Sequence, residues 1–263
     1  ISKLFFKKPL LIRCGYEIFD AYRFQKKSPL FLYLIWLISF LAYRYSNSIN
    51  VASMEDSVVV KKYFKINPNK IIVRPNWIDI SVFKNYNVKK IKNRILFVGR
   101  LEEQKNIHLL LEALSGTTIG LDIVGDGRLK NTLIDESKEL NVNVNFLGSF
   151  PNNKMVSIYN AYSIYVLCSP YEGNPKTLLE AMACGCAVIG TNVPGIKSII
   201  EHYENGILVD ESPLELRSAI LKLLSNNLLT KRLALNSIEF IKNNNFLEKN
   251  ILSEYDEYNR LLN

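Results

Sequence analysis

Short apolar runs alternate with amphipathic stretches along most of the 263 residues. The runs are rich in branched side chains, as in strands buried on both faces of a parallel sheet, and they occupy residues 9–14, 49–52, 70–73, 95–99, 121–124, 164–168 and 186–189. Between them, apolar residues recur at helical spacing, for example at Ile107, Leu110, Leu111 and Leu114. This succession of strands and helices predicts an α/β fold with parallel sheets.

Three helix starts can be predicted from capping signals. Ser53 with Asp56 forms an approximate capping box for a helix that runs through residue 64, and the sequence Ser-Pro-Leu-Glu at 212–215 forms another. Asn174 followed by Pro175 resembles a capping side chain and a first helical residue. We therefore expect a helix at 175–184, ended by a glycine at 185.

Residues 29–43, PLFLYLIWLISFLAY, are the most apolar stretch of the chain. The stretch is shorter than the roughly 20 residues that span a bilayer. A helical stripe runs along it, at Leu30, Tyr33, Leu34, Leu37 and Leu41. Trp36 and Phe40 make the opposite side apolar as well, which favours a buried helix. The basic residues Lys26, Lys27 and Arg44 leave a second interpretation open, an interfacial helix that meets a membrane surface.

Composition and charge narrow the function classes. With 48% hydrophobic and 22% charged residues, the chain can bury a core and does not resemble a disordered protein. The net charge of +8 favours anionic partners such as a nucleotide or an acidic membrane surface. Because no nucleic-acid module and no run of interleaved arginines and aromatics is visible, we expect no nucleic-acid partner.

Cysteine and histidine usage indicates a reducing compartment and no metal site. Cys14, Cys168, Cys184 and Cys186 lie mostly in apolar runs and show no metal-binding spacing, so we expect reduced core thiols and a cytoplasmic location. The chain has two histidines, neither beside another candidate ligand. Since the first residue is Ile1 and the first sheet lacks strands, we also expect that the chain is incomplete at its N-terminus.

The stretch 169–185 carries the strongest chemical signal. Backbone N–H groups at the start of the predicted helix would face the carboxyl edge of a sheet, where a helix N-terminus favours a phosphate. Glu172 and Glu180 lie on either side of that position. A carboxylate repels phosphate but accepts hydrogen bonds from neutral hydroxyl groups. The arrangement suits a ligand with an anionic centre and hydroxyl groups at both ends, such as a nucleotide sugar.

These residues resemble a known motif. EGNPKTLLEAMACGCAV at 172–188 is similar to the E-x7-E motif of family-four retaining glycosyltransferases, and it departs from the usual pattern at Asn174 and at Cys186 and Ala187. GRLEEQKNIHLLLEAL at 99–114 is similar to the family pattern that carries an arginine and a lysine, here Arg100 and Lys105. VRPNWIDISVFK at 73–84 is similar to the family's linker. The resemblance extends over nearly the whole chain.

The resemblance implies a GT-B fold, an α/β architecture of two Rossmann-like domains with parallel sheets, the first of them partial here. We expect domain limits at 1–89 and 90–242, followed by a helix at 243–263 that returns to the first domain. It further implies that Arg100 and Lys105 bind the donor diphosphate, Glu172 the transferred sugar and Glu180 the ribose. The remaining expected donor-site positions are Gly173, Asn174, Pro175, Thr177, Leu178 and Gly125, with Phe146 near the base.

The predicted function is retaining, metal-independent sugar transfer from a UDP- or GDP-sugar to a glycan or lipid-linked acceptor in surface polysaccharide synthesis. The nucleotide sugar is a co-substrate, and no other cofactor is expected. The predicted location is cytoplasmic, with peripheral contact at the inner face of the plasma membrane as an extension. Two alternatives stay open: a nucleotide-sugar isomerase or hydrolase on the same fold, and a truncated, non-catalytic nucleotide-binding module.

Overall fold

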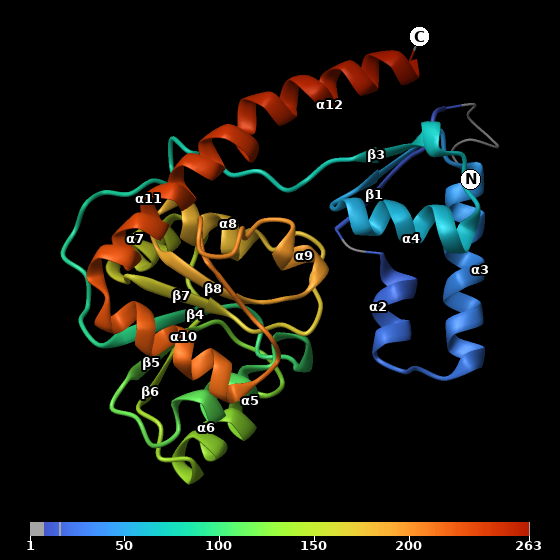
Figure 1. Ribbon diagram of the computed structural model, residues 1–263. Coiled ribbons are helices and arrows are strands. Elements are labelled where there is room, and N and C mark those ends of the chain that lie inside the picture. Colours follow the sequence, from blue (N-terminus) through green and yellow to red (C-terminus); the bar gives the residue numbers. More distant parts are fainter. Residues whose placement is uncertain (1–7, 16, 263) are drawn as a thin grey trace. The chain divides into compact units, whose positions relative to one another are not determined.

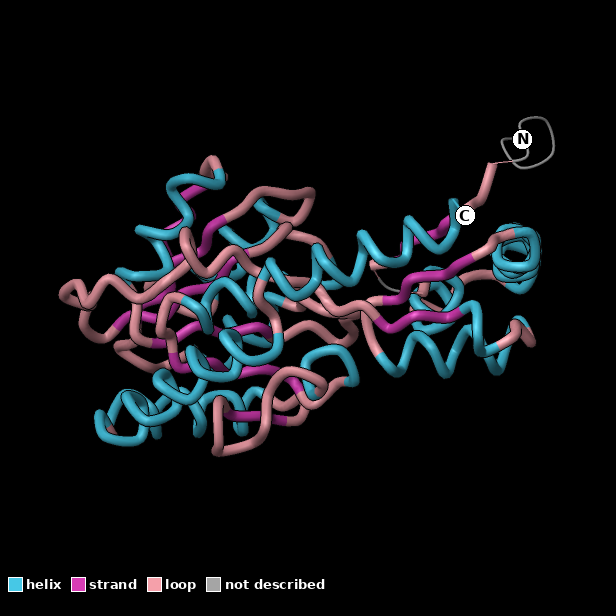
Figure 2. The backbone as a smooth tube through the Cα atoms, turned by 90° about the horizontal axis from the view of Figure 1, so that it is seen from above, coloured by secondary structure: helices cyan, strands magenta, loops and turns pink. Residues whose placement is uncertain are grey.

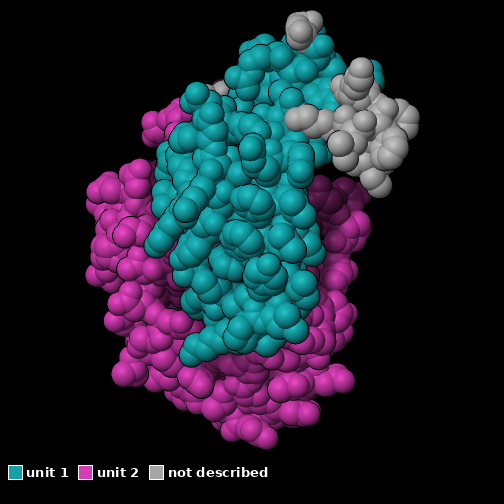
Figure 3. All heavy atoms as spheres, turned by 90° about the vertical axis from the view of Figure 1, so that its right-hand side faces the viewer, with its two compact units in different colours: residues 1–76, 172–174, 247–263 teal, residues 77–171, 175–246 magenta. Residues whose placement is uncertain are grey.

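The computed structural model describes residues 8–15 and 17–262, which form two compact units (Figure 3). Unit 1 contains the described residues up to Asn76, the short segment 172–174, and the chain from Leu247 onward. Unit 2 contains residues 77–171 and 175–246. The domain limits expected from the sequence, at 89 and 242, stay a prediction.

Unit 1 is built on a three-stranded parallel sheet in the order β1-β2-β3 (Figure 1). Its elements are β1 (Leu11–Cys14), α2 (Ile18–Phe24), α3 (Pro29–Tyr45), β2 (Ser48–Val51), α4 (Met54–Phe64), the 3-10 helix η1 (Pro68–Lys70), β3 (Ile71–Val73) and α12 (Leu247–Leu262). The strands predicted at 9–14, 49–52 and 70–73 are confirmed to within two residues. Helix α2 was not predicted, because seven residues are too few to display a helical period.

Helices α3 and α4 pack over the sheet of unit 1 through aromatic side chains. The Phe64 ring meets Tyr43 edge to face, with centroids 5.0 Å apart, and lies parallel to Trp36 at 6.4 Å. The predicted capping box of α4 is confirmed, since the Ser53 hydroxyl accepts from the backbone N–H of Asp56 at 3.1 Å and donates to its carboxylate at 2.8 Å.

One face of α3 is exposed in the described chain. Trp36 and Phe40 pack against the core of unit 1, whereas Leu30, Leu34 and Ile38 are 71%, 48% and 64% exposed. The expectation of a buried helix is therefore wrong for this face of α3. None of the described helices combines the length and apolar character required to cross a bilayer.

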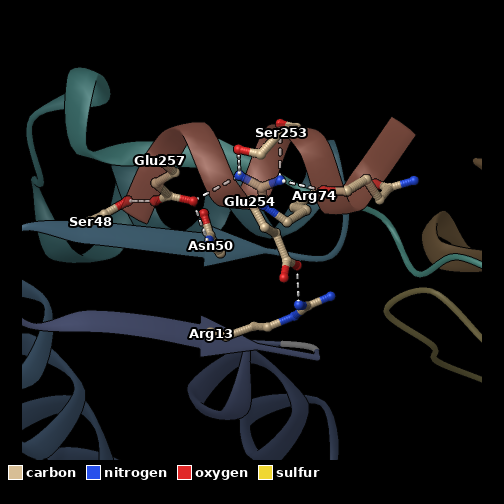
Figure 4. Close-up of polar contacts among 8 residues, drawn as sticks. Arg13, Ser48, Asn50, Arg74, Ser253, Glu254 and Glu257 are labelled. Carbon is tan, nitrogen blue, oxygen red and sulfur yellow. Dashed lines mark hydrogen bonds and ion pairs between the residues drawn. The ribbon is translucent and has the colours of Figure 1, made fainter. Parts of the chain in front are cut away.

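Helix α12 returns to the sheet of unit 1 through a buried polar network (Figure 4). The Glu257 carboxylate accepts from Ser48, from the Asn50 amide at 2.9 Å and from the Arg74 guanidinium at 2.7 Å. Arg74 also donates to the hydroxyl and the carbonyl of Ser253. The network therefore ties α12 to β2 and to the end of β3.

Unit 2 is a six-stranded, all-parallel sheet in the order β6-β5-β4-β7-β8-β9, with helices on its faces (Figures 1 and 2). Its strands are β4 (Arg94–Val98), β5 (Gly120–Val124), β6 (Val144–Gly148), β7 (Ile164–Leu167), β8 (Ala187–Thr191) and β9 (Ile207–Val209). Its helices are η2 (Glu103–Lys105), α5 (Ile107–Leu114), α6 (Lys130–Glu139), α7 (Asn152–Ala161), α8 (Lys176–Ala183), α9 (Pro194–Lys197), α10 (Pro213–Ser225) and α11 (Asn227–Asn244).

The strand order of unit 2 reverses between β4 and β7. The chain adds β5 and β6 on one side of β4, then crosses to β7 and adds β8 and β9 on the other side. In an open parallel sheet, ligands bind outside the carboxyl ends of the strands at such a reversal point. The topology therefore places the segments after β4 and β7 at a ligand-binding crevice, and these segments contain residues 99–105 and 168–178.

A glycine allows the loops after β4 and β5 to pack backbone against backbone. Gly125 has φ +143°, and a Cβ there would lie 1.9 Å from the carbonyl oxygen of Gly99. Only glycine fits this position without a backbone shift. The close approach brings the two strand ends together at the floor of the crevice.

Candidate functional site

A cavity of about 410 Å³ lies past the carboxyl ends of β4, β5 and β6 in unit 2. Its walls come from the ends of β4 and β5, the loops after β4, β5 and β6, and the helices η2, α7 and α8, through residues Val98, Gly99, Arg100, Lys105, Val124, Gly125, Asp126, Ser149, Phe150, Met155, Thr177 and Glu180. Five of the residues singled out from the sequence therefore line one cavity, namely Arg100, Lys105, Gly125, Thr177 and Glu180. We call it the donor cavity.

Arg100 is the first of two cationic side chains that line the donor cavity. It leaves the end of β4 with an exposed side chain, and its guanidinium donates to the Gln104 amide oxygen at 3.4 Å. The amide nitrogen of Gln104 in turn donates to the carbonyl oxygen of Tyr171 at 3.4 Å. Gln104 thus connects Arg100 to the loop that follows β7, a link that the sequence did not reveal.

Lys105 is the second cation, at the end of η2. The thiol of Cys168, in the residue after β7, donates to the carbonyl oxygens of Lys105 and Asn106 at 3.3 and 3.2 Å. Asn106 has φ 45°, a left-handed conformation that asparagine tolerates. Burial raises the pKa of Cys168 to about 12, so the thiol stays protonated and can donate. Cys168 therefore holds the turn that presents Lys105.

Helix α8 begins at Lys176, next to the donor cavity. The Thr177 hydroxyl accepts from the Tyr165 hydroxyl at 2.9 Å, which fixes the first turn of α8 to β7. The first N–H groups of a helix have no partner within it, and the helix dipole favours an anion there. The backbone N–H of Leu178 donates to the Pro175 carbonyl at 3.2 Å, and the side chain of Leu178 is fully buried.

Glu180 brings a nearly buried carboxylate to the same cavity. It is 8% exposed, and its Oε2 accepts from the Tyr159 hydroxyl at 2.8 Å. Burial raises its pKa, an effect that the Tyr159 hydrogen bond and the nearby Lys176 charge partly oppose. The sequence did not single out Tyr159. Its contact with Glu180 spans 21 residues, so no local pattern could have indicated it.

The loop between β7 and α8 carries Glu172, which is half-buried, followed by the buried Gly173 and Asn174, and these three residues belong to unit 1. The prediction that Asn174 caps the helix is wrong, because Pro175 is the N-cap residue of α8. Asn174 is paired with Asn76 instead. Its Oδ1 accepts from the backbone N–H of Asn76 at 2.9 Å, and its carbonyl accepts from the Asn76 side-chain amide at 2.5 Å.

The expected base-facing stretch lies at the end of β6. Phe146 packs against the hydrophobic core of unit 2, whereas Ser149 and Phe150, a few residues further on, line the donor cavity. The Phe150 side chain is 41% exposed. The expected position of Phe146 near a base stays a prediction, and the sequence did not single out Phe150, because an aromatic residue after a strand is usually a packing residue.

The described part of the chain contains no group of three or more His, Cys, Asp and Glu side chains arranged to hold a metal ion. The metal independence expected from the sequence stays a prediction. Arg100 and Lys105 are the cationic side chains among the residues that line the donor cavity.

Comparison with known proteins gives a family match. The family model described as "Glycosyl transferases group 1" matches residues 80–240, which include every residue that lines the donor cavity.

Two curated relatives match most of this chain over about half of their own length. An uncharacterized glycosyltransferase of Haemophilus influenzae is 32% identical over 198 residues, covering 72% of this chain and 54% of the relative. The UDP-Gal:alpha-D-GlcNAc-diphosphoundecaprenol alpha-1,3-galactosyltransferase of Escherichia coli is 28% identical over 214 residues, covering 74% and 55%. The chain thus spans about half the length of these relatives.

A solved structure supports the fold over nearly the whole chain. The crystal structure of Anabaena HepE in complex with UDP superposes with a TM-score of 0.85 over 98% of this chain and 74% of HepE, at 17% sequence identity. At that identity the likeness establishes the fold. The Rossmann-like GT-B architecture expected from the sequence is confirmed.

Proposed function

Because this chain belongs to the group 1 family of glycosyl transferases, we propose that it transfers a sugar from a UDP- or GDP-sugar to a lipid-linked or glycan acceptor, with retention of the anomeric configuration. The observation that carries the proposal is the donor cavity. Two cations, Arg100 and Lys105, and the nearly buried carboxylate of Glu180 line one cavity at the strand-order reversal.

The proposed chemistry makes one bond and breaks one. The acceptor hydroxyl attacks the anomeric carbon on the face from which the diphosphate leaves. The bond between this carbon and the phosphate oxygen breaks, its electron pair stays on the diphosphate, and the hydroxyl proton passes to that diphosphate. Arg100 and Lys105 stabilise the growing negative charge, and fixed charges in a partly dehydrated site do this well.

The carboxylates have separate proposed tasks. Glu180 accepts hydrogen bonds from the ribose hydroxyls, since an ionised carboxylate is a strong acceptor. Glu172 and the loop residues Gly173 to Pro175 hold the transferred sugar. Phe150, half-exposed at the cavity wall, offers an aromatic face to the base.

The relatives support the proposed acceptor class. The E. coli relative is named for transfer to a sugar on undecaprenol diphosphate, which supports a lipid-linked acceptor and a role in surface polysaccharide synthesis. We further propose that the exposed face of α3 contacts the inner face of the plasma membrane. Its apolar residues Leu30, Leu34 and Ile38 are exposed, and Lys26 and Lys27 precede the helix.

Binding of UDP to the 263-residue chain tests the donor site. Titration calorimetry should show that Lys105→Ala weakens UDP binding by about 10- to 100-fold, because a charge-assisted hydrogen bond contributes about 1.5–3 kcal/mol. Lys138→Ala is the matched control, since the Lys138 side chain is 71% exposed on α6, outside the donor cavity. Equal UDP affinity in the two variants would contradict the assigned role of Lys105.

A transfer assay separates the proposed reaction from its alternatives. The chain is incubated with a UDP-sugar, with and without a polyprenyl-diphosphate-linked sugar acceptor. Glu172→Gln should abolish transfer while UDP binding persists. Complete donor turnover without acceptor would indicate an isomerase or hydrolase instead, and UDP binding without turnover of any donor would indicate a non-catalytic module.

A further inference from the structure

A second cavity, of about 890 Å³, lies at the opposite edge of the sheet in unit 2. It is lined by Arg94 at the start of β4 and Ile164 at the start of β7, whereas the donor cavity follows the carboxyl ends of the strands. The amino ends of parallel strands share one edge, so the two cavities are separate. We call this one the basal cavity.

One wall of the basal cavity is the segment 85–93, which is attached at two points. The backbone N–H of Tyr86 donates to the Asn160 side-chain oxygen at 2.7 Å, and the backbone N–H of Ile91 donates to the carbonyl of Ala161 at 2.8 Å. Asn160 is itself 2% exposed. Both attachments are to the end of α7, so the wall is part of the folded framework.

The facing wall is aliphatic and comes from two helices. Leu223 and Leu224 lie at the end of α10, and Leu235 and Ile238 lie on α11. Leu235 is 64% exposed. The volume falls within the range of about 300–1,000 Å³ that is usual for small-molecule sites, and such sites are mostly apolar with a few polar groups. The wall therefore suits the hydrocarbon part of a ligand.

The charged residues along the basal cavity are all basic. They are Lys89, Lys90, Lys92, Arg94 and Lys231, and no carboxylate is among the described residues that line it. The Arg94 guanidinium is neutralised by Asp122, whose carboxylate oxygens lie 3.0 Å from Nε. The four lysines leave the cavity positive.

Lys90 points more specifically to an anion. Its Nζ is buried and has no hydrogen-bond partner among the residues that the structure describes. The thiols of Cys184 and Cys186 are near enough to feel its charge, but burial raises the pKa of both, and they stay neutral. A buried ammonium group without a counter-charge is unfavourable, and a bound anion would remove that cost.

We propose that the basal cavity is a binding site for a small amphiphilic anion, a phosphate or carboxylate carrying a hydrocarbon chain. The Lys90 side chain turns from its buried position toward the cavity and pairs with the anionic group, and the hydrocarbon chain lies along Leu224, Leu235 and Ile238. The site is independent of sugar transfer at the donor cavity, because it occupies the other edge of the sheet.

Dodecyl phosphate, used below its critical micelle concentration, is the probe. Titration calorimetry with the 263-residue chain should show one saturable site. Lys90→Met should weaken this binding at least tenfold while leaving UDP affinity unchanged. The same variant should also raise the thermal unfolding midpoint of the unliganded chain, because it replaces a buried charge with an apolar side chain of similar length.

Two further variants and one neutral probe make the test specific. Ala234→Phe should also weaken binding, because Ala234 lines the aliphatic wall and a larger side chain occupies the space of the alkyl chain. Lys138→Met, an exposed substitution on α6, should bind the probe like the parent chain. Undetectable binding by the parent chain, Lys90→Met affinity within twofold of it, or equal binding of dodecyl maltoside would each overturn the proposal.

The source of the anion is decided by comparing two forms of it. Vesicles of phosphatidylcholine with phosphatidylglycerol present the phosphate on a membrane, and hexyl phosphate presents it in solution. Vesicle binding that Lys90→Met weakens assigns the site to a membrane lipid, whereas binding of hexyl phosphate alone assigns it to a soluble metabolite. Binding of neither form by the parent chain would count against the site.

Discussion

The buried pair of Arg74 and Glu257 gives the sharpest test of how unit 1 is held together. We predict that Glu257→Gln, which keeps the size of the side chain and removes its charge, destabilises unit 1 strongly. The two side chains are 4% and 3% exposed, so the remaining guanidinium would be buried without a counter-charge. Breaking a buried ion pair by removing one partner typically costs about 3–5 kcal/mol of unfolding free energy.

The same helix provides a matched control. Glu254, three residues before Glu257, pairs with Arg13, whose side chain is 41% exposed (Figure 4). Exposed ion pairs typically contribute about 0.2–1 kcal/mol. Glu254→Gln should therefore cost less than about 1 kcal/mol, and the gap between the two variants reflects burial of the pair.

The pH dependence of this contribution has a defined sign. Burial alone would raise the pKa of Glu257, but the hydrogen bonds from Ser48, Asn50 and Arg74 outweigh it and hold the pKa below its ordinary value of 4.5. A carboxyl with a depressed pKa stabilises the fold above its unfolded pKa and loses that contribution as pH falls through the folded one. The difference between Glu257→Gln and the parent chain should therefore shrink in acid.

Urea unfolding followed by tryptophan fluorescence measures these values for unit 1. The chain has two tryptophans, Trp36 in unit 1 and Trp77 in unit 2, so Trp77→Phe leaves a reporter in unit 1 alone. The reasoning is refuted if Glu257→Gln and Glu254→Gln differ by less than about 0.5 kcal/mol, the usual range of surface substitutions. Arg74→Met combined with Glu257→Gln should recover much of the loss, because no buried charge is left.

Three further predictions concern the donor cavity and the loop beside it. Glu180→Gln should stabilise the unliganded chain at pH 7 yet weaken UDP binding. Because burial raises the pKa of Glu180, ionisation of this carboxyl lowers the unfolding free energy as the pH rises from 4.5 through the folded pKa. The stability advantage of the variant, measured by urea unfolding, should therefore vanish below pH 4.5. Gly125→Ala should lower the unfolding free energy by well over about 1 kcal/mol in the same assay, since its Cβ would lie 1.9 Å from the carbonyl oxygen of Gly99. Gly116→Ala is the control: its φ is +72° and no atom lies within 4 Å of the added Cβ, so this variant should show backbone strain alone. Asn174→Ala should lower the unfolding free energy by about 0.5–1.5 kcal/mol, because the backbone N–H of the half-buried Asn76 loses its acceptor. Asn174→Asp should retain most of that free energy, and equal losses in the two variants would contradict the assigned contact.

The inner strands of the sheet of unit 2 were predictable because they are buried on both faces. A strand of this kind is apolar at most positions, so the run at 164–168 predicted β7, and the structure places it at Ile164–Leu167 with four buried residues. The parallel order then followed from the helices between strands. Short elements without such a pattern, such as α2, could not be predicted.

The donor cavity was predictable in part. Arg100, Lys105 and Glu180 were identified through the resemblance to the family-four motifs, and the expected edge of the sheet, where parallel strands end, supported that assignment. The contacts that position them were not visible in the sequence. Tyr159 donates to Glu180, 21 residues away, and Gln104 donates to Tyr171, 67 residues away. Contacts over such separations leave no pattern in the local sequence.

Asn174 shows why a correct local rule can give a wrong role. An asparagine before a proline can cap a helix, but the cap position is taken by Pro175, whose extended backbone precedes α8. The side chain is thereby released to accept from the backbone N–H of Asn76, 98 residues earlier, in the segment that follows β3. The backbone carbonyl of Asn174 also accepts from the Asn76 side-chain amide, so two hydrogen bonds join the two residues. The residue that departs from the family pattern is therefore held to Asn76 within unit 1, and a substitution there tests that contact directly.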